Sequence, residues 1–404
     1  MTTAGQSAPL ASAPLAAPLA LGRKRLGLVL GINQTLSWGM TFYLPAVIAV
    51  PAAQDLGRST VSLLGAFTMS LLIAGLCAPR VGRWIDRHGG KGSVAASVVV
   101  LASGQIILAL SPNLEVWYLG WAVLGIGMAM GLYDAAFATV GTLLGREAAP
   151  TITGITLLAG LASTVFWSLG SAIIGFMGWR GLMLVYVCIM LCVNLPMVLT
   201  FVPRLDRNLK ETKQTATERT PVSRRVTICL ASFFALRWFI TSALAAHILA
   251  LFQGIGLNAA EAVLVASLIG PGQVAGRVLE WTVGRRFGLL LRARAAALLF
   301  PIGAAILPLG GPVAATVFAL LYGMSNGIMT INRGTLPLAL FGPNGYATVL
   351  GWLAVPVLVA QAVAPTVAAP LVAALPAVSV FLIGGGLGLF ATLLLLPLRL
   401  PRQD

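Results

Sequence analysis

The sequence is divided into a dozen apolar segments, and its basic residues lie almost entirely in alternate gaps between them. A helix of about 20 apolar residues is long enough to cross a bilayer, and it satisfies its own backbone hydrogen bonds there. We therefore expect an all-α membrane protein with twelve transmembrane helices. The predicted segments are residues 26–50, 59–79, 93–111, 116–142, 151–177, 181–202, 226–252, 262–282, 292–310, 313–332, 346–368 and 377–398.

The composition excludes a soluble globular protein. Of the 404 residues, 58% are hydrophobic and only 9% are charged, whereas about a quarter of the residues in soluble domains are charged. The net charge of +15 does not indicate a nucleic-acid partner, because a nucleic-acid-binding protein gathers its basic residues on one soluble face. Here they flank apolar segments, so we expect the lipid bilayer as the surroundings.

The distribution of basic residues predicts the orientation. The two termini and the even-numbered gaps hold 22 Lys and Arg residues, and the odd-numbered gaps hold only Arg58 and Arg180. Arg237 and Arg277 lie inside predicted helices. By the positive-inside rule, both termini are cytoplasmic. We expect a multi-pass protein of a bacterial cytoplasmic (inner) membrane.

The longest polar gap, residues 203–225, divides the chain into two sets of six helices. We interpret it as a cytoplasmic linker between two pseudo-symmetric six-helix bundles, residues 26–202 and 226–404. Residues 1–25 are interpreted as a disordered cytoplasmic tail. A signal peptide is not expected, because the first basic residue, Arg23, follows the apolar stretch instead of preceding it.

A short motif lies between the second and third predicted helices. It reads Val-Gly-Arg-Trp-Ile-Asp-Arg-His-Gly-Gly-Lys over residues 81–91, and its characteristic residues are Gly82, Asp86, Arg87, Gly89 and Lys91. Glycines at the ends of a turn and a charged pair between them suit a turn that locks two helices together. A weaker second copy occupies residues 276–286.

This motif resembles the signature loop of the major facilitator superfamily, G-x-x-x-D-R-x-G-R followed by Lys or Arg, with Gly90 departing from the pattern. The resemblance covers the whole chain and implies a monomeric secondary transporter, in which two bundles rock about a site near mid-membrane and the motif acts as a gate. It implies no enzyme activity and no cofactor, and it does not name a substrate. The fifth helix lacks the Gly-Pro motif of many drug antiporters, which disfavours drug exchange.

Ionisable residues inside a membrane mark functional sites or structural pairs. Arg237 lies near the predicted midplane of the seventh helix, where a guanidinium suits a carboxylate ligand. Arg277, in the eighth helix, resembles the anion-binding Arg of monocarboxylate porters but also falls in the second copy of the gating motif. Both are candidate substrate-binding residues, and structural pairing is the alternative. Glu280 lies on the same helix face as Arg277 and is expected to neutralise it.

Two further residues are candidates for proton coupling. His247 is one, because histidine is the side chain suited to carrying a proton at physiological pH; an ordinary interhelical hydrogen bond is the alternative. Asp134 lies in the cytoplasmic third of the fourth helix. We expect it to join a charge relay with Arg87 or Lys91, or to carry the proton.

Uncharged residues complete the predicted site. Gln34 and Trp38 are one turn apart on the first helix, and Asn326 lies on the tenth; interfacial anchoring or interhelical bonding would explain them equally well. No metal site is expected, because the two histidines lie far from any ligand cluster. The sequence therefore predicts a transporter for a small organic anion, coupled to protons through one of the ionisable groups.

The alternative is an exporter of drugs or metalloids. Cys188 and Cys192, four residues apart, share a helix face on which a soft metalloid could bind, although small apolar cysteines are common in helix packing. A membrane enzyme is disfavoured, because acid, base or metal ligands do not cluster at one depth and the sequence contains no phosphate-binding loop.

Overall fold

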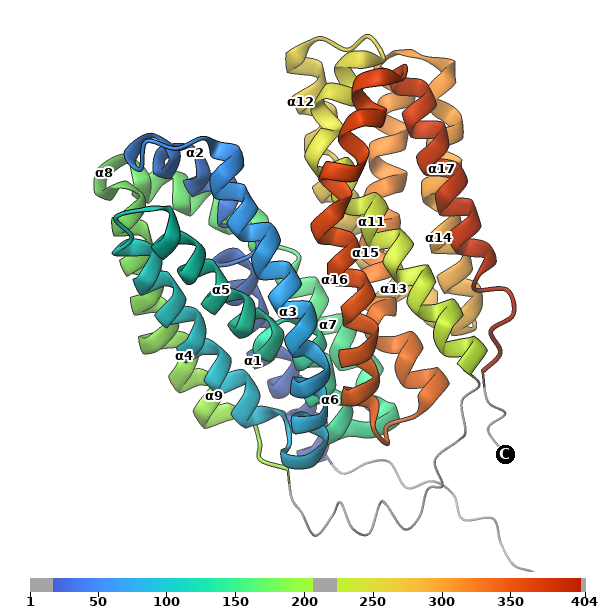
Figure 1. The fold of residues 1–404 in the computed structure, drawn as a ribbon. Helices are drawn as coiled ribbons and strands as arrows, with labels where there is room; N and C mark the ends of the chain where they lie inside the picture. The colour runs from blue at the N-terminus through green and yellow to red at the C-terminus, as the bar shows by residue number, and fades with distance from the viewer. Residues whose placement is uncertain (1–16, 206–223, 401–404) are drawn as a thin grey trace, which may run out of the picture.

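The computed structural model describes residues 17–205 and 224–400, and all the regular structure within them is helical. Figure 1 shows two groups of helices that converge at one end and separate toward the other. The sequence-based prediction of an all-α membrane fold is confirmed. Most of the predicted linker and much of the predicted tail lie outside the described residues.

The first bundle contains α1 to α9. Its elements are α1 (Ala17–Gly39), α2 (Pro45–Asp55), α3 (Thr60–His88), α4 (Gly90–Ala109), α5 (Leu114–Gly131), α6 (Tyr133–Leu144), η1 (Gly145–Ala148), α7 (Ala149–Ala159), α8 (Ala162–Ile189), η2 (Met190–Asn194) and α9 (Leu195–Phe201). Several predicted membrane segments are broken helices here. The first segment consists of α1 and α2, and the fourth consists of α5 and α6.

The second bundle contains α11 to α17. Its elements are α11 (Arg224–Gly254), α12 (Ala259–Ser267), α13 (Ile269–Thr282), η3 (Gly284–Arg286), α14 (Leu289–Ile306), η4 (Leu307–Leu309), α15 (Gly311–Phe341), α16 (Tyr346–Ala374) and α17 (Ala377–Leu393). The eighth predicted segment is α12 with α13. The ninth is α14 with η4, and the other four correspond to single helices.

Among the described residues, eight helical stretches are long and apolar enough to cross a membrane. One of them, Leu114–Phe201, has 88 residues and includes three of the predicted segments, and the shorter apolar helix α17 supplies another. The chain bends within α8 at Gly178, whose φ of 68° is accessible to glycine without strain. The fifth and sixth predicted segments meet at this residue.

The structure moves several predicted boundaries. Helix α1 begins at Ala17, inside the segment assigned to a tail. Helix α15 has 31 residues and continues to Phe341, so Arg333 lies within a helix and is buried, not in a connecting loop. The residues between Arg333 and Gly342 are mostly apolar or small, so the helix continues past the charged Arg333.

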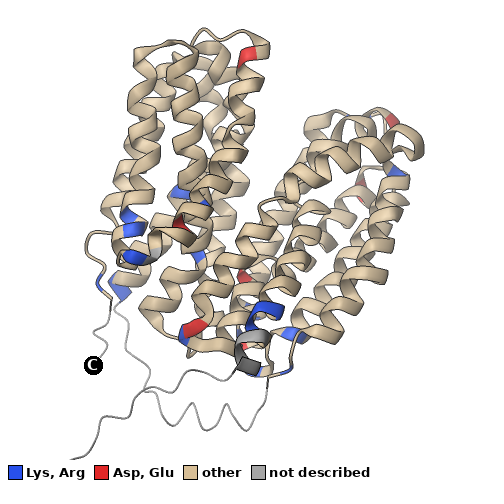
Figure 2. Ribbon diagram, turned by 180° about the vertical axis from the view of Figure 1, so that it is seen from behind, with Lys and Arg blue, Asp and Glu red and all other residues tan. Residues whose placement is uncertain are grey.

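Most of the described Lys and Arg residues lie toward the end of the molecule where the bundles converge (Figure 2). We call this the basic end; it contains the C-terminus of α3 and the η1 turn. The opposite end, where the bundles separate, is the open end. Apolar side chains of both bundles pack together at the basic end, among them Phe137 and Val140 against Tyr346 and Leu350.

The bundles touch along α3 and α16. Glycines allow the two backbones to approach closely: a Cβ at Gly82 would collide with the carbonyl of Ala347, and one at Gly351 would collide with that of Ala78. Small residues serve this purpose where helices cross in membranes. The predicted gating residue Gly82 is therefore a contact point between the two bundles.

Asp86 binds the N-terminus of α16. Its carboxylate accepts hydrogen bonds from the backbone N–H groups of Ala347 (3.2 Å) and Thr348 (2.8 Å) and from the Thr348 hydroxyl (2.6 Å). An anion is favoured there because the first N–H groups of a helix lack helical partners. The motif thus joins α3 to the second bundle, whereas Gly89, with φ 82°, forms the turn into α4.

We expect Gly82→Val to prevent the basic end from closing, because the added side chain would meet the backbone of α16. Overpacking of this kind costs about 1–3 kcal/mol, enough to change the ratio of open to closed forms at least several-fold. Distances between spin labels on α3 and α16 would measure the change. Gly154→Val is the matched control, since a Cβ at Gly154 would meet no described atom within 4 Å apart from its chain neighbours and the backbone of its own helix. Equal distances in both variants would contradict the prediction.

Candidate functional site

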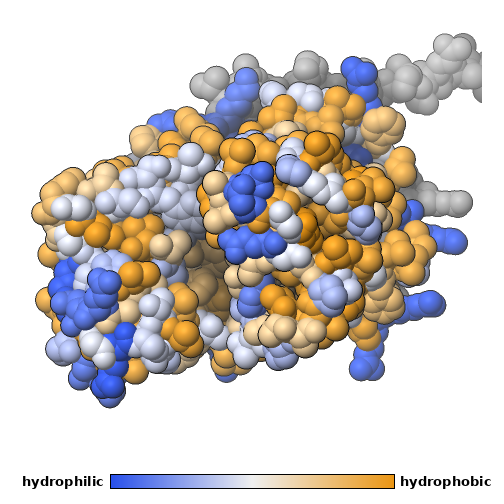
Figure 3. Space-filling view, turned by 90° about the horizontal axis from the view of Figure 1, so that it is seen from above, coloured by the Kyte–Doolittle hydropathy of each residue, from blue (hydrophilic) through white to orange (hydrophobic). Residues whose placement is uncertain are grey.

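A cavity lies between the two bundles and has about 1280 Å³ of empty space, including the part open to solvent. Seen from the open end, the surface is hollowed between the bundles (Figure 3). The first bundle contributes residues of α1, α3, α5 and α6, and the second contributes residues of α11, α13, α15 and α16. The cavity is therefore closed at the basic end and accessible from the open end.

The wall from the first bundle is aromatic. It includes Trp38, Phe42, Tyr43 and Tyr133. The ring centre of Trp38 lies 4.8 Å from that of Tyr133 and 4.9 Å from that of Phe42. The ring centres of Phe42 and Tyr43 are 5.6 Å apart. These separations are typical of interacting aromatic pairs.

A hydrogen-bonded amide fixes Trp38. The indole Nε1 donates to Oε1 of Gln34 (3.2 Å), and Nε2 of Gln34 donates to the carbonyl of Gly131 (2.7 Å). Gly131 is the last residue of α5, and Leu132 has an extended backbone before α6 begins. Gln34 therefore satisfies a carbonyl that the helix break exposes, and the break directs Tyr133 and Asp134 toward the cavity.

The opposite wall contains Arg237, whose residue is only 1% exposed. Its Nη2 donates to the Ser325 hydroxyl (3.1 Å) and to Oδ1 of Asn326 (3.0 Å), and its guanidinium lies 5.4 Å from the ring centre of Phe300. Nε and Nη1 have no hydrogen-bond partner within residues 17–205 and 224–400. Arg237 thus lines the cavity as a buried cation without a carboxylate partner in these ranges.

Arg277 on α13 is the second such cation, 4% exposed. Within the described part of the chain its one hydrogen bond is a long one of 3.4 Å to Gln273, and its Nε and Nη1 are unpartnered. The guanidinium reaches the first bundle: a Cβ at Gly160 would collide with Nη1. It also lies close enough to Tyr43 and Tyr133 to interact electrostatically with their phenol groups.

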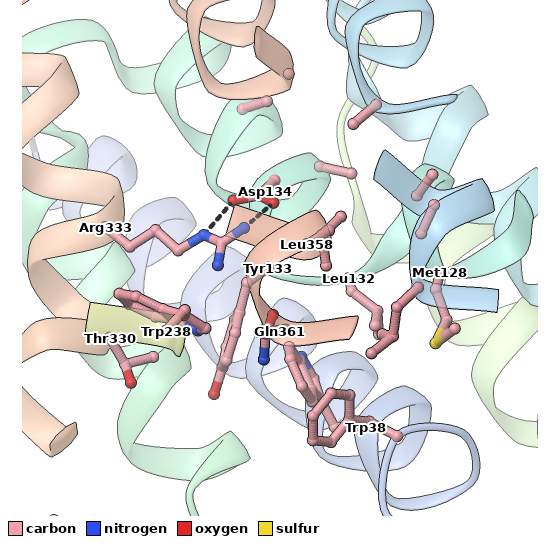
Figure 4. A pocket seen from close by; sticks show the side chains of 18 of the residues that line it. Trp38, Met128, Leu132, Tyr133, Asp134, Trp238, Thr330, Arg333, Leu358 and Gln361 are labelled. Atoms are coloured by element: carbon pink, nitrogen blue, oxygen red, sulfur yellow. Dashed lines mark hydrogen bonds and ion pairs between the residues drawn. The ribbon is translucent and has the colours of Figure 1, made fainter. Parts of the chain in front are cut away.

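The remaining charges of the cavity neutralise each other. Arg333 on α15 holds Asp134 on α6 through two hydrogen bonds, Nε to Oδ1 (2.8 Å) and Nη2 to Oδ2 (2.6 Å), as Figure 4 shows. The Arg333 guanidinium also lies 5.0 Å from the ring centre of Trp238. This pair joins the two bundles. Among the described lining residues, Arg237 and Arg277 then leave an excess of two positive charges.

The structure brings together most of the predicted site. Trp38, Asp134, Arg237, Arg277 and Asn326 all line the cavity. Gln34 lies outside the lining and accepts a hydrogen bond from the indole of Trp38. His247 also lies outside the lining, where its Nε2 is 3.0 Å from the carbonyl of Pro365.

Two predicted partners were wrong. Asp134 pairs with Arg333 and not with Arg87 or Lys91, because the extended α15 brings Arg333 to the same depth. Glu280 pairs with Arg292 on α14 and not with Arg277, although both lie on one helix. Arg277 lines the cavity instead, and it has no carboxylate partner among the residues that the structure describes.

Other lining residues were missed, among them Tyr133, Trp238, Arg333 and Gln361. Figure 4 shows their side chains grouped around the cavity with Trp38. The sequence could have placed Arg333 inside a helix, because small and apolar residues continue on both sides of it. The helix break that turns Tyr133 toward the cavity could not be predicted, because no proline marks it in the sequence. Groups of three or more His, Cys, Asp or Glu that could hold a metal are absent from the described residues.

Comparisons with known proteins agree with this architecture. A family model described as Major Facilitator Superfamily matches residues 30–355. Among solved structures, the fold is similar to the human organic anion transporter MFSD10 (TETRAN), with a TM-score of 0.74 and 18% identity over 92% of this chain and 99% of that one.

Two sugar transporters have similar folds. The E. coli fucose:proton symporter FucP gives a TM-score of 0.71 and 14% identity over 91% of this chain and 97% of that one. The proton:xylose symporter XylE gives a TM-score of 0.65 and 14% identity, with coverages of 93% and 94%. At these identities the likeness concerns the fold.

Proposed function

The chain belongs to the major facilitator superfamily, and on that premise we propose that it transports a small organic anion together with protons. It is a multi-pass membrane protein with the fold of secondary transporters. The proposed mechanism is alternating access, in which the cavity opens to one side of the membrane at a time.

The observation that carries this proposal is the excess positive charge of the cavity. Arg237 and Arg277 are buried, line the cavity and lack a carboxylate partner among the described residues. Burying an unpaired charge is costly. A cavity that contains two unpaired cations is therefore suited to an anionic substrate, which would compensate their charge. A neutral sugar would leave both charges uncompensated.

The orientation follows from the positive-inside rule. We propose that the basic end faces the cytoplasm, with both termini there, and that the structure represents the outward-open form in a bacterial inner membrane. The segment 203–225 is then the linker between bundles 26–202 and 226–404. The proposed gate at the basic end consists of three contacts: Asp86 with α16, Gly82 with α16, and Asp134 with Arg333.

The comparisons support this choice in two ways. The human protein with a similar fold is described as an organic anion transporter, and the other two are described as proton symporters. For proton coupling we favour Asp134 over His247. Asp134 lines the cavity and bridges the bundles, so its protonation would weaken the contact that keeps the basic end closed.

The alternative of metalloid export is less well supported. Cys188 and Cys192, on α8 and η2, are both exposed and do not line the cavity. Arsenite binding by this pair would place the metalloid away from the transport path. Drug export is the second candidate, restricted to anionic drugs by the charge of the cavity.

We expect purified protein in proteoliposomes to accumulate labelled organic anions when the pH outside is lower than inside. A protonophore should abolish the accumulation, and neutral amides of the same acids should not be transported. Empty liposomes provide the control for passive entry of the protonated acid. Equal transport of amide and acid, or accumulation insensitive to the protonophore, would refute the proposal.

A further inference from the structure

The two walls of the cavity differ in chemistry. Four aromatic rings line the first bundle's side. Arg237 and Arg277, which have no carboxylate partner within the described ranges, belong to the second bundle. Resting on the proposed anion transport, we infer that the substrate is an aromatic carboxylate, whose ring packs against Trp38 and whose carboxylate binds between Arg277 and the phenols of Tyr43 and Tyr133.

The carboxylate position follows from groups that still lack partners. Nε and Nη1 of Arg277 have no hydrogen bond to the described residues. The phenol oxygens of Tyr43 and Tyr133 have none either within residues 17–205 and 224–400. A guanidinium and two phenol O–H groups are donors suited to the two oxygens of one carboxylate. Since the tyrosines and Arg277 belong to different bundles, this carboxylate would connect them.

The ring position follows from the rigidity of Trp38. Its indole is held by Gln34 and contacts Phe42 and Tyr133 at 4.9 and 4.8 Å. A fixed aromatic surface costs little entropy on binding, because its side chain is already ordered. Aromatic ligands gain both apolar burial and ring stacking on such a surface, whereas a short aliphatic acid gains no stacking and little burial.

Arg237 has a different role in this arrangement. Its Nη2 is bonded to Ser325 and Asn326, and its guanidinium faces Phe300 within the second bundle. It contributes positive electrostatic potential to the cavity, but we infer that the carboxylate binds at Arg277 and not at Arg237. A cationic ligand could also use an aromatic surface, but both arginines would repel it. A dicarboxylate that contacts both arginines is the main competing ligand.

The test measures the binding of defined probes to the full chain in detergent by thermal shift and Trp fluorescence. The probes are benzoate, 3-phenylpropionate and indole-3-acetate, with propionate, succinate, benzamide and tetraphenylphosphonium for comparison. We expect at least one aromatic carboxylate to bind about tenfold more tightly than propionate and succinate, given the magnitude of aromatic contacts. Benzamide and the cation should not bind.

Two variants locate the two parts of the ligand. Trp38→Leu should weaken binding of the aromatic acid about tenfold and leave the weaker propionate binding unchanged. Arg277→Gln should weaken both acids. Trp352→Leu and Arg286→Gln are matched controls, because both residues are exposed and lie outside the cavity. They should bind all the probes as the natural protein does.

The outcomes separate this inference from the proposed function. Propionate or succinate binding as tightly as every aromatic acid, with no effect of Trp38→Leu, would refute the aromatic substrate and leave anion transport standing. Benzamide or the cation binding as well as benzoate would overturn both. No binding of any aromatic acid at about 10 mM, an affinity too weak for a specific site, would also overturn the inference.

Discussion

Arg237→Ala is expected to abolish uptake of the anion while the protein still folds and reaches the membrane. At a separation of about 8 Å and an effective dielectric constant of about 20, a unit charge attracts an anion by about 2 kcal/mol. Losing this attraction lowers the affinity by about 30-fold. Uptake into proteoliposomes at a fixed substrate concentration measures the effect.

The variant should not be less stable for electrostatic reasons. Arg237 has no carboxylate partner among the residues that the structure describes, so its removal leaves no buried anion unpaired there. The Ser325 hydroxyl still donates to the carbonyl of Ala296 (2.7 Å), and Thr241 still donates to Asn326 (3.2 Å). Removing a desolvated charge even favours folding. We therefore expect an unfolding midpoint equal to or above that of the natural protein.

The controls distinguish charge from shape. Arg237→Lys keeps the charge but lacks the planar donor geometry, and we expect it to retain part of the uptake. Arg286→Ala removes an exposed arginine outside the cavity and should transport normally. Undiminished uptake by Arg237→Ala would remove the argument for an anionic substrate.

Asp134→Asn is expected to open the basic end. The substitution imitates a protonated carboxyl, which cannot hold the Arg333 guanidinium through two charge-assisted bonds. It leaves Arg333, with a side chain 10% exposed, as an unpaired buried cation. Breaking such a pair costs about 3–5 kcal/mol, which shifts the ratio of the two forms by more than about 100-fold.

Cysteine accessibility measures this shift. Ala138 lines the cavity beside the gate, so Ala138→Cys in a variant without the four natural cysteines reports opening through its reaction with an impermeant maleimide from the basic end. While Asp134 is present, the reaction should be slow, because its ion pair with Arg333 holds the basic end closed. When Asp134→Asn is added to the same background and the pH is kept constant, the reaction should be fast.

Two further variants test the interpretation. Exchanging the charges, with Asp134→Arg and Arg333→Asp together, should restore slow labelling. Asp55→Asn breaks the exposed pair with Arg180 near the open end, which is worth at most about 1 kcal/mol, and should leave labelling unchanged. Slow labelling in Asp134→Asn would show that another group controls the gate.

The sequence predicts the membrane fold because hydropathy and helix length are local properties. Twelve apolar segments and the Asp86 motif indicate the family without any knowledge of packing. The cavity is harder to predict, since it depends on which face of each helix meets the other bundle. Arg237 and Arg277 were identified because charge inside an apolar segment is visible in the sequence, whereas Tyr133 looks like any buried aromatic residue.

The wrong partners have a common cause. Arg87 or Lys91 was predicted to pair with Asp134 because both belong to the signature motif. Arg277 was predicted to pair with Glu280 because the two are three residues apart. In the structure Asp134 pairs with Arg333, 199 residues away. Such pairing depends on the crossing of α6 and α15 between bundles. Helix register across an interface is not encoded in any local pattern.

The amide of Gln34 has a consequence for how this transporter changes its substrate during evolution. It binds the indole of Trp38 through its oxygen and the carbonyl of Gly131, at the helix break, through its nitrogen. The aromatic wall and the segment carrying Asp134 are therefore held by the same side chain. Mutations on that wall would disturb recognition and gating together. On the second bundle, Gln273 and Thr330 line the cavity from the helices α13 and α15. We expect lineages to diversify in specificity mainly through that wall.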